Sequence, residues 1–434
     1  MTTFAISTLG CKVNTYESQG YAQALRDYGF NEVSFKETAD IYIINTCAVT
    51  NTAAAKSRQK IHQAQKQNKK AMIVAVGCYA QSDFKKLKED PAIHLLIGSD
   101  QKELLPKLIQ SAWGKSQRYH CVHDMRVMSA FEAIPVRSFV HQTRAYLKIQ
   151  DGCNQFCSYC IIPYTRGSER SLSPDQVIEQ AKALVANGHL EIVLTGIHTG
   201  RYGREYHVTL SSLLERLCKE VTGLQRIRIS SIEMNEINDE LIALMKREPK
   251  IARHLHIPIQ SADNEILKLM NRPYNIEQFA QRMNEIRTLL PDISISTDVI
   301  TGFPSESDAH FESGYQCLNE LAFSFLHVFP FSKRDGTKAA LMKGQLNNQV
   351  KKQRSTRLNR LSEALYQAYQ RRFINRCVAV LWEEVKGDLM FGHTSEYLGV
   401  YAPYEAASLH KLETRRIIAY ENDKLLCEAQ EVNG

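Results

Sequence analysis

Residues 152–167 read GCNQFCSYCIIPYTRG, and the three cysteines of this stretch, Cys153, Cys157 and Cys160, decide how the middle of the chain is interpreted. Thiolates are the standard ligands of iron-sulfur clusters, and the Cx3Cx2C spacing lets one loop reach three corners of a four-iron cubane. The alternative is a structural zinc site, which nearly always closes with a fourth cysteine or histidine that this loop lacks. The stretch therefore predicts a cluster in which one iron stays open to a ligand.

The sequence on both sides of this loop alternates short apolar runs with helical patterns. Six runs favour strands: AYLKIQ, EIVLTG, RIRISS, HLHIPIQ, ISISTDVI and FSFLHVFP. Helices are expected between them, over residues 174–187, 210–218, 265–270 and 277–290. Parallel strands with helical crossovers form barrels whose active sites lie at the carboxyl ends of the strands. We therefore expect a partial (β/α)6 barrel with the cysteine loop at the end of its first strand.

Three more cysteines follow apolar runs in the first hundred residues. FAISTLG, ADIYIINT, AMIVAVG and AIHLLIG favour strands, with helices expected over residues 15–28 and 53–67, and this alternation predicts an open parallel sheet. Cys11, Cys47 and Cys78 each come directly after one of these strands. The carboxyl ends of neighbouring parallel strands meet at one edge of a sheet, where open α/β folds bind ligands. We therefore expect a metal site at this edge.

The length of 434 residues suggests two or three domains. Beyond residue 375 the runs CVAVLWEEV, YLGVYAPY, RRIIAYEND and KLLCEAQEV alternate without helices, which indicates a small all-β barrel. The expected fold class is therefore α/β with a C-terminal β module. Its expected parts are an N-terminal domain over 1–113, a connector over 114–142, a barrel domain with a basic helix over 143–372, and the β module over 373–434.

The composition is that of an ordinary soluble protein, with 44% hydrophobic and 23% charged residues. The N-terminus MTTFAISTLGCKVN has no charged leader, and no apolar run approaches the roughly 18 residues of a membrane span. We therefore expect a cytoplasmic protein without a membrane partner. In such a protein eleven cysteines favour metal binding over disulfides. Five scattered ones are expected to be small buried side chains: Cys121, Cys218, Cys317, Cys377 and Cys427.

Positive charge is concentrated in two stretches. Residues 332–372 hold eleven lysines and arginines against two acidic residues, and residues 56–70 hold six basic residues and no acidic one. In the first stretch Leu358, Leu361, Leu365 and Tyr369 recur at helical spacing, which predicts one packed face and one cationic face. A solvated helix explains either run alone, whereas the two together favour a nucleic-acid partner.

The Cx3Cx2C loop resembles the radical S-adenosylmethionine superfamily, in which the open iron binds the amino and carboxylate groups of S-adenosylmethionine. The resemblance implies that strand ends complete this cofactor site, although a glycine after a strand is more often only a turn. Six residues match positions that contact the cofactor in that superfamily: Tyr159, Thr195, Gly196, Gln260, Ser261 and Gly302.

Nearly the whole chain resembles the methylthiotransferase family. The similar segments include LGCKVNTYES, NTCAVT, VGCYAQ, CNQFCSYCIIPYTRGSERS and HLHIPIQSADNEILKLMNR, and the C-terminal segment resembles the RNA-binding TRAM domain. CKVN after the first LG is similar to the branch that modifies N6-threonylcarbamoyladenosine at position 37 of tRNA, whereas the isopentenyladenosine branch usually has CQMN. One departure is Ser168, where the family usually has arginine.

The resemblance implies a two-cluster enzyme. One [4Fe-4S] cluster on Cys11, Cys47 and Cys78 would carry a sulfur that one S-adenosylmethionine methylates, and a second cluster on the Cx3Cx2C cysteines would cleave another S-adenosylmethionine after one-electron reduction. The radical would remove hydrogen from C2 of adenine, a bond too strong for a general base. The implied partners are the tRNA anticodon loop, a one-electron donor such as flavodoxin and a sulfur source, and we expect a monomer.

Three alternatives remain at this level. A methylthiotransferase for isopentenyladenosine-37 tRNA, or one for a ribosomal protein side chain, would share both clusters. The basic helix and CKVN count against the protein substrate. A non-catalytic RNA-binding iron-sulfur sensor is a different class, and it would not need a complete barrel.

Overall fold

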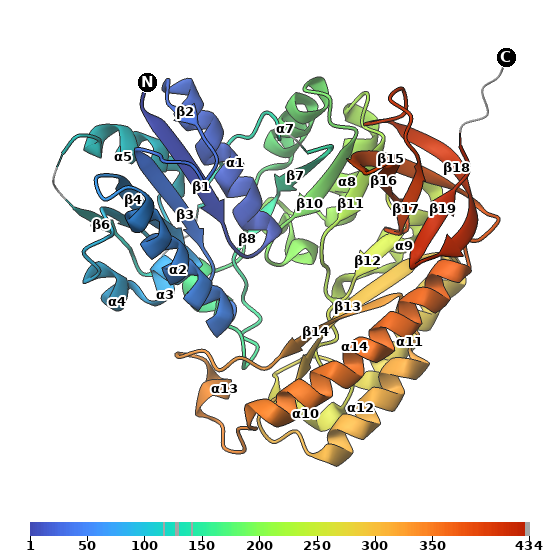
Figure 1. Ribbon diagram of the computed structural model, residues 1–434. Coiled ribbons are helices and arrows are strands. Elements are labelled where there is room, and N and C mark those ends of the chain that lie inside the picture. Colours follow the sequence, from blue (N-terminus) through green and yellow to red (C-terminus); the bar gives the residue numbers. More distant parts are fainter. Residues whose placement is uncertain (116–117, 126–129, 140–141, 430–434) are drawn as a thin grey trace.

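A computed structural model of the chain describes residues 1–115, 118–125, 130–139 and 142–429. The N-terminal part is a parallel sheet in the order β2-β1-β3-β4-β5-β6 (Figure 1). Its strands are β1 (Thr3–Thr8), β2 (Asn31–Glu32), β3 (Ile41–Thr46), β4 (Met72–Gly77), β5 (Leu95–Ile97) and β6 (Tyr119–Cys121). Its helices are α1 (Lys12–Asp27), α2 (Asn51–Gln67), α3 (Cys78–Ser82), α4 (Phe84–Lys88) and α5 (Leu105–Ala112).

The central strands of this sheet are buried on both faces, since every residue of β3 and β4 is buried. This burial explains their continuous apolar runs. On one face Tyr42 and Ile44 pack with α2, and on the other Phe4 and Val74 belong to a core that continues into the middle of the chain. The N-terminal and central parts therefore share one core.

The middle of the chain contains six parallel strands in two sheets, ordered β7-β10-β11 and β12-β13-β14. A parallel bridge between Ile227 and Ile251 joins the two sheets. The strands are β7 (Arg144–Lys148), β10 (Glu191–Thr195), β11 (Arg226–Ile229), β12 (His254–His256), β13 (Ser294–Thr301) and β14 (Phe325–Pro330). The helices between them are α7 (Pro174–Ala186), α8 (Leu210–Glu220), α9 (Asp239–Arg247), α10 (Asn264–Leu269), α11 (Ile276–Leu289) and α12 (Asp308–Glu320).

Each strand of these two sheets has an apolar and a polar face, as the period of two requires. In β10, Ile192 and Leu194 pack in the core with Leu213 of α8, whereas Glu191 points to the other face and binds two arginines of β11. Because the helices cover the apolar face, the polar face is the concave one, here called the polar inner face. Its residues are Arg144, Glu191, Arg226, Arg228, His254, His256, Asp298 and His327.

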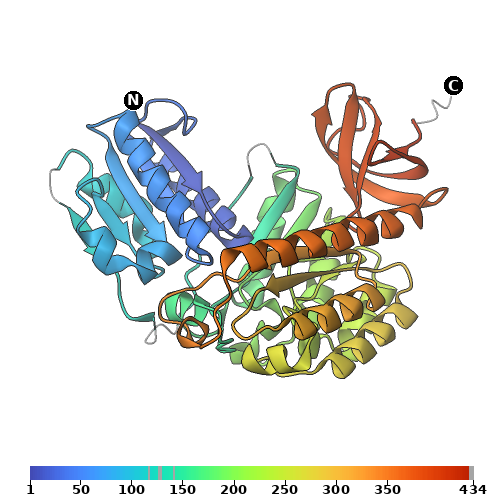
Figure 2. The ribbon, with the colours of Figure 1, turned by 60° about the horizontal axis from the view of Figure 1, so that its bottom comes forward.

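The C-terminal part is a closed barrel in the order β15-β16-β17-β19-β18, filled by the fully buried Trp382. Its strands are β15 (Cys377–Lys386), β16 (Leu389–Thr394), β17 (Gly399–Pro403), β18 (Leu412–Glu421) and β19 (Lys424–Cys427). Helix α14 (Asn348–Arg371), preceded by α13 (Lys338–Leu341), leads from the central part to this barrel, as Figure 2 shows.

Two arginines of the polar inner face hold the C-terminal barrel in place. Arg226 donates to the carbonyl oxygens of His393 (3.1 Å) and Ala379 (2.8 Å). Arg228 donates to those of Thr394 and Ser395, both at 3.0 Å. The buried Glu191 pairs with both arginines. The β module therefore closes one side of the central barrel.

The predicted fold class is confirmed, with parallel α/β parts followed by an all-β barrel. Helix α2 begins at Asn51, earlier than expected, because the Thr50 side chain accepts a hydrogen bond from the Ala53 amide and caps the helix there. Strand β6 lies inside the range expected to be a connector, parts of which fall outside the described residues. No helix in the described ranges combines the length and apolar character needed to cross a bilayer.

The basic helix has the packed face that its apolar spacing predicted, but this face also holds two cations. The apolar positions pack as expected, with Leu358, Leu361 and Tyr369 buried. However, Lys351 and Arg354 are buried too. They lie on the packed side because their polar ends find partners there: Lys351 donates to the Phe331 carbonyl and Arg354 pairs with Glu306.

Candidate two-cluster site

The N-terminal cysteines lie at the ends of three adjacent strands, β1, β3 and β4. Gly10 has a φ of +99°, and a Cβ there would lie 2.8 Å from the Cys47 sulfur, so only glycine permits this approach. Asn14 fixes the same corner, since its side-chain amide donates to the carbonyl oxygens of Leu9 (2.6 Å) and Thr46 (3.1 Å). Cys11, Cys47 and Cys78 therefore follow adjacent strands at one edge of the sheet.

Electrostatics show that these three sulfurs act on one another. Burial raises the pKa of Cys47 to about 11, and the nearby Cys78 and Cys11 add to this rise. Burial also raises the pKa of Cys11, while Arg166 acts in the opposite direction. Three neighbouring thiolates repel one another, so this set favours a bound cation.

The second cysteine triplet lies in the loop between β8 (Gln150–Asp151) and α6 (Ile162–Arg166). The Cys153 amide donates to the Gly167 carbonyl at 3.0 Å, and the Cys160 amide donates to the Cys157 carbonyl at 2.9 Å. Burial raises the pKa of both Cys157 and Cys160. Cys157 and Cys153 both act electrostatically on Cys160, so the three cysteines of this loop lie near one another.

The number of thiolates in each triplet suits a cluster with one open iron. Structural zinc sites nearly always close with four protein ligands. Among the described residues, two sets of three metal-binding side chains have ligand atoms within 4.8 Å of one another, and neither cysteine triplet is such a set. Each triplet supplies three thiolates, the number that leaves one iron of a four-iron cluster open to a ligand.

In each triplet, one cysteine contacts a buried arginine, and the two arginines are different residues. Arg166 Nε donates to the Cys78 sulfur at 3.2 Å, and Arg272 Nη1 donates to the Cys157 sulfur at 3.4 Å. Arg166 belongs to the radical-type loop, yet it reaches the N-terminal triplet and also donates to Asn14 at 2.8 Å. The two cysteine sites therefore lie on either side of one short helix. Neither arginine was singled out from the sequence.

Arg166 also belongs to a fully buried ion network. Glu17 of α1 pairs with Lys102 at 2.5 Å, with Lys148 at 3.1 Å and with Arg166 at 3.1 Å. Burial alone raises the pKa of Glu17, but these three cations together hold it far below its usual range. Asp151 completes the network through Lys148 and Arg166. These contacts join the N-terminal sheet to the first strands of the barrel.

The residues matched to S-adenosylmethionine contacts lie on the same strand-end edge as the cysteine loop. Thr195 ends β10, and a Cβ at the following Gly196 would come within 3.0 Å of Gln150. Gln260 and Ser261 follow β12, and Gln260 has a φ of +66°. Gly302 follows β13 with a φ of +70°, and its amide already donates to Glu306 at 2.7 Å.

Tyr159 lies partly buried beside these strand ends. It packs against the core group around Phe303 and is electrostatically coupled to Arg272 and Cys157. Burial raises the pKa of its phenol well above the usual value. Tyr159, within the cysteine loop, therefore packs against the segment that follows Gly302. Ser168, the departure from the family pattern, is exposed, and it is the Ser168 carbonyl that Arg170 contacts.

Two further groups of polar side chains were missed from the sequence. His198 Nδ1 lies 3.4 Å from the Cys153 sulfur, and hydrogen bonds to Cys153, Glu169 and Glu236 outweigh burial and raise the pKa of His198 to about 12. Cys121 was expected to be only a small buried side chain, but it lies with Asp100 and His123 in a group of metal-binding type. The Cys-x-His spacing was the signal available for this second group.

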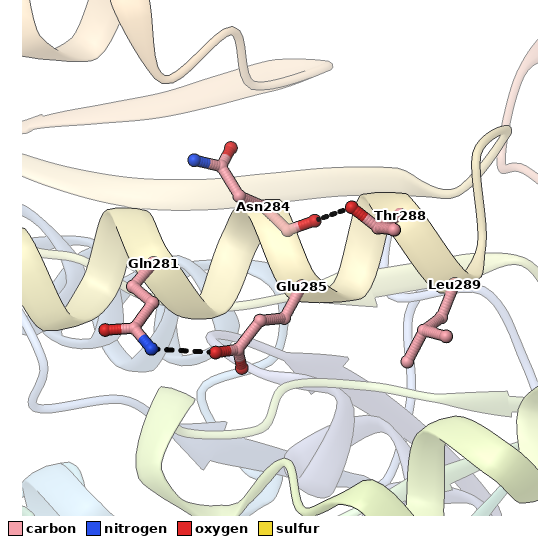
Figure 3. A pocket seen from close by; sticks show the side chains of 5 residues that line it. All are labelled: Gln281, Asn284, Glu285, Thr288 and Leu289. Atoms are coloured by element: carbon pink, nitrogen blue, oxygen red, sulfur yellow. Dashed lines mark hydrogen bonds between the residues drawn. The ribbon is translucent and has the colours of Figure 1, made fainter.

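A surface hollow on α11 lies apart from these sites. It is lined by residues of that helix, and Figure 3 shows that they bond to one another: Gln281 donates to Glu285 and Thr288 donates to the Asn284 carbonyl. No cysteine and no residue of the polar inner face lines it. We therefore assign the hollow no part in the chemistry.

Comparison with known proteins agrees with this geometry. Residues 147–317 match the radical SAM superfamily, and residues 3–98 match the uncharacterized protein family UPF0004. The fold is similar to that of the radical S-adenosylmethionine methyltransferase TsrM from Kitasatospora setae, with a TM-score of 0.53, 14% identity, and coverage of 75% of this chain and 72% of that one. The fold and the Cx3Cx2C loop thus define a radical S-adenosylmethionine enzyme.

Sequence relatives narrow this class. The threonylcarbamoyladenosine tRNA methylthiotransferase MtaB of Bacillus subtilis is 43% identical over 92% of this chain and 90% of its own length. The tRNA-2-methylthio-N(6)-dimethylallyladenosine synthase of Moorella thermoacetica is 34% identical over 88% of this chain and 87% of its own length. The chain belongs to the tRNA methylthiotransferase family.

Proposed function

We propose that this enzyme inserts a methylthio group at C2 of N6-threonylcarbamoyladenosine at position 37 of tRNA. The observation that carries the proposal is Arg166, which extends from the radical-type loop and binds Cys78 of the other triplet at 3.2 Å. A residue shared in this way supports one reaction space for both cysteine sites. The relative of 43% identity, named for threonylcarbamoyladenosine, supports this nucleoside.

The roles of the residues follow from this arrangement. When bound, the clusters and S-adenosylmethionine supply sulfur methylation and the one-electron chemistry that breaks the C2–H bond. Cys153, Cys157 and Cys160 hold the radical-type cluster, and Cys11, Cys47 and Cys78 hold the auxiliary one. The cofactor is oriented by Tyr159 of the cysteine loop and by five residues near strand ends. These five are Thr195, Gly196, Gln260, Ser261 and Gly302.

We propose two [4Fe-4S] clusters per chain, because each triplet supplies three thiolates and a neighbouring arginine. Anaerobic reconstitution should then load about eight irons and eight sulfides per chain. A Cys157→Ala variant and a Cys78→Ala variant should each retain about four. A wild-type content that stays near four would rule out the second cluster.

The N-terminal triplet is proposed as the site from which sulfur is transferred. A Cys47→Ala variant should still cleave S-adenosylmethionine to 5′-deoxyadenosine, because Cys47 belongs to the auxiliary triplet and not to the radical-type loop, but it should form no methylthio product. Chromatography of the nucleosides measures both products in one reaction. Methylthiolation that persists in this variant would show that the sulfur comes from elsewhere.

The remaining partners are part of the same proposal. The exposed cations of α14 and the closed barrel, which we interpret as TRAM-like, would hold the anticodon stem and loop. We also propose the domain division 1–113, 114–142, 143–372 and 373–434, a monomeric state, a cytoplasmic location, a flavodoxin-type donor and a separate sulfur source.

Mass spectrometry of tRNA nucleosides tests the function directly. Cells that lack this gene should lose 2-methylthio-N6-threonylcarbamoyladenosine and accumulate its precursor, and the restored gene should reverse both changes. A gene with Cys11→Ala is the matched control. If the isopentenyl nucleoside changes instead, the enzyme acts on the substrate of the second relative. If neither nucleoside changes, the function is not tRNA methylthiolation.

A further inference from the structure

Asp100, Cys121 and His123 lie together at one edge of the N-terminal sheet, outside both cysteine triplets. Asp100 follows β5, and Cys121 is the last residue of the neighbouring β6. The Gly98 amide donates to the Cys121 carbonyl at 2.9 Å, so the pairing of the two strands continues to this point. A carboxylate oxygen, a thiol sulfur and a ring nitrogen therefore meet where two parallel strands end, all within 4.8 Å of one another.

The distances within this group suit a single metal ion. The Cys121 sulfur lies 3.9 Å from Nδ1 and 4.0 Å from Nε2 of His123, and Asp100 contacts the same Nδ1. Tetrahedral zinc, with bonds of about 2.3 Å to sulfur and about 2.0 Å to nitrogen, holds two such donors about 3.6 Å apart. The His123 side chain is 50% exposed, so solvent reaches the group and the ring has room to adjust to an ion.

Gln101 supplies a fourth donor. The Cys121 thiol donates to the Gln101 side-chain oxygen at 2.9 Å, so this oxygen faces the sulfur. Binding of a divalent ion releases the thiol proton to solvent and leaves the oxygen available to the ion. One sulfur, one nitrogen and two oxygens make four ligands, the number with which structural zinc sites close. This mixed set differs from the cysteine triplets, which each offer three thiolates.

The Asp100 carboxylate independently indicates a missing cation. Asp100 is 1% exposed, and its Oδ1 has no hydrogen-bond partner within the described residues. In those ranges its ion pair is with His123, a side chain that is charged only when protonated. A buried carboxylate without a permanent positive partner is costly, because the protein interior solvates charge poorly. A divalent ion bound beside Asp100 removes this cost.

Helix α3 holds the backbone of the group in place. Gln81 of this helix donates to the His123 carbonyl at 2.8 Å, and it accepts a hydrogen bond from the Ser99 amide at 3.0 Å. One side chain thus fixes the residue before Asp100 and the residue that carries the imidazole. Contacts of this kind orient the ligands of metal sites.

We propose that Asp100, Gln101, Cys121 and His123 bind one zinc-type divalent ion at a structural site separate from the two clusters. A thiolate and an imidazole together favour zinc over magnesium or calcium, which prefer oxygen ligands alone. The ion fastens the ends of β5 and β6 to each other and to the residues that leave the sheet after Cys121. This inference does not depend on the proposed reaction.

Zinc loading of the reconstituted enzyme tests this inference. The chain is reconstituted with iron and sulfide, freed of excess sulfide, exposed to Zn²⁺ and freed of unbound metal. Plasma mass spectrometry should then find about one zinc per chain in addition to the iron of the clusters. His123→Ala and Cys121→Ser should each weaken zinc binding at least about tenfold, measured by competition with a chelating dye, at unchanged iron content. Because His123 is half exposed, its replacement should leave the chain folded.

X-ray absorption at the zinc edge identifies the ligands without interference from iron. Zinc at the proposed site should show one sulfur at about 2.3 Å and nitrogen or oxygen ligands at about 2.0 Å. Zinc that has entered a cysteine triplet would show three sulfurs instead. The number of sulfurs therefore separates the proposed site from misloaded cluster sites.

Two matched variants serve as controls. His62 of α2 also pairs with an aspartate, Asp90 at 3.6 Å, but it belongs to no three-ligand group among the described residues. His62→Ala should therefore leave zinc binding unchanged. Cys218→Ser, at a buried cysteine of α8, should do the same.

Three results would overturn the inference. A reconstituted wild type that retains no zinc would leave Asp100 and His123 as an ion pair only. Zinc binding as tight in His123→Ala and Cys121→Ser as in the wild type would place the ion elsewhere. A zinc spectrum with three sulfurs would assign the metal to a cysteine triplet.

Discussion

At the scale of single residues, Arg166 has the most consequential position. Its guanidinium is fully buried and binds Cys78, Asn14, Glu17 and Asp151 at the same time. A planar group with five donors can satisfy such a set of partners, whereas the single ammonium of lysine cannot. A cation beside a cluster thiolate stabilises the more negative, reduced state of that cluster.

Arg166→Lys should therefore lower the reduction potential of the auxiliary cluster, since the shorter side chain no longer reaches the Cys78 sulfur. We expect a decrease of about 60 mV or more, which corresponds to a tenfold change in a one-electron equilibrium. Potentiometric EPR titration in a Cys157→Ala background measures this cluster alone. An unchanged potential at full iron content would contradict the expected role.

At the scale of elements, α14 shows how tertiary contacts change the meaning of a charge run. The positively charged stretch predicted an RNA surface, but Arg354 and Arg357 are paired with Glu306, Asp308 and Glu312. Lys352 and Arg360 are exposed, and among the described residues they have no ion pair. The RNA-binding charge of this helix is thus smaller than its composition suggests.

Charge reversal at these two positions should weaken RNA binding. A plot of log affinity against log salt concentration has a negative slope. The double change Lys352→Glu and Arg360→Glu should make this slope shallower by about 0.7 to 0.9 for each phosphate that the helix no longer neutralises. Fluorescence anisotropy with a tRNA at several salt concentrations measures this slope. Lys246→Glu on α9 is the control, and an equal decrease there would show that only net charge matters.

At the scale of the whole molecule, the buried network around Glu17 joins the N-terminal part to the barrel. Lys102 and Glu17 come from the first part, and Lys148 and Arg166 from the second. Removing one partner from such a group leaves buried charges uncompensated, which costs roughly 3 to 5 kcal/mol. The network therefore holds the two cysteine sites in a fixed relation.

Glu17→Gln should destabilise the chain at pH 7 by about this amount, measured by urea unfolding. Because the pKa of Glu17 is lowered in the folded state, its contribution is complete above the unfolded value of about 4.3 and is lost as the pH falls below it. The variant and the wild type should therefore become more similar in stability toward acid pH.

The same substitution at Glu215, whose side chain is 38% exposed, should leave stability nearly unchanged at every pH, since its pairs with Lys219 and Arg247 are open to solvent. A Glu17 variant that unfolds like the wild type at pH 7 would show that the network does not hold the two parts together.

The sequence by itself determined the features that are local or periodic. The Cx3Cx2C loop, the strands that end at Cys11, Cys47 and Cys78, and the order of strands and helices follow from spacing and apolar period, which need no knowledge of distant contacts. These features were sufficient to predict the fold class, whereas the methylthiotransferase family was predicted from the resemblance of whole sequence segments to that family.

Only the tertiary structure decided which distant residues meet. Arg166 contacts Cys78, and Arg228 binds the carbonyl oxygens of Thr394 and Ser395, across long separations in sequence that no local pattern records. The physical reason is that these contacts depend on how two sheets and a β barrel pack together. Packing selects individual partners for charged groups, whereas the sequence shows only that the charges are present.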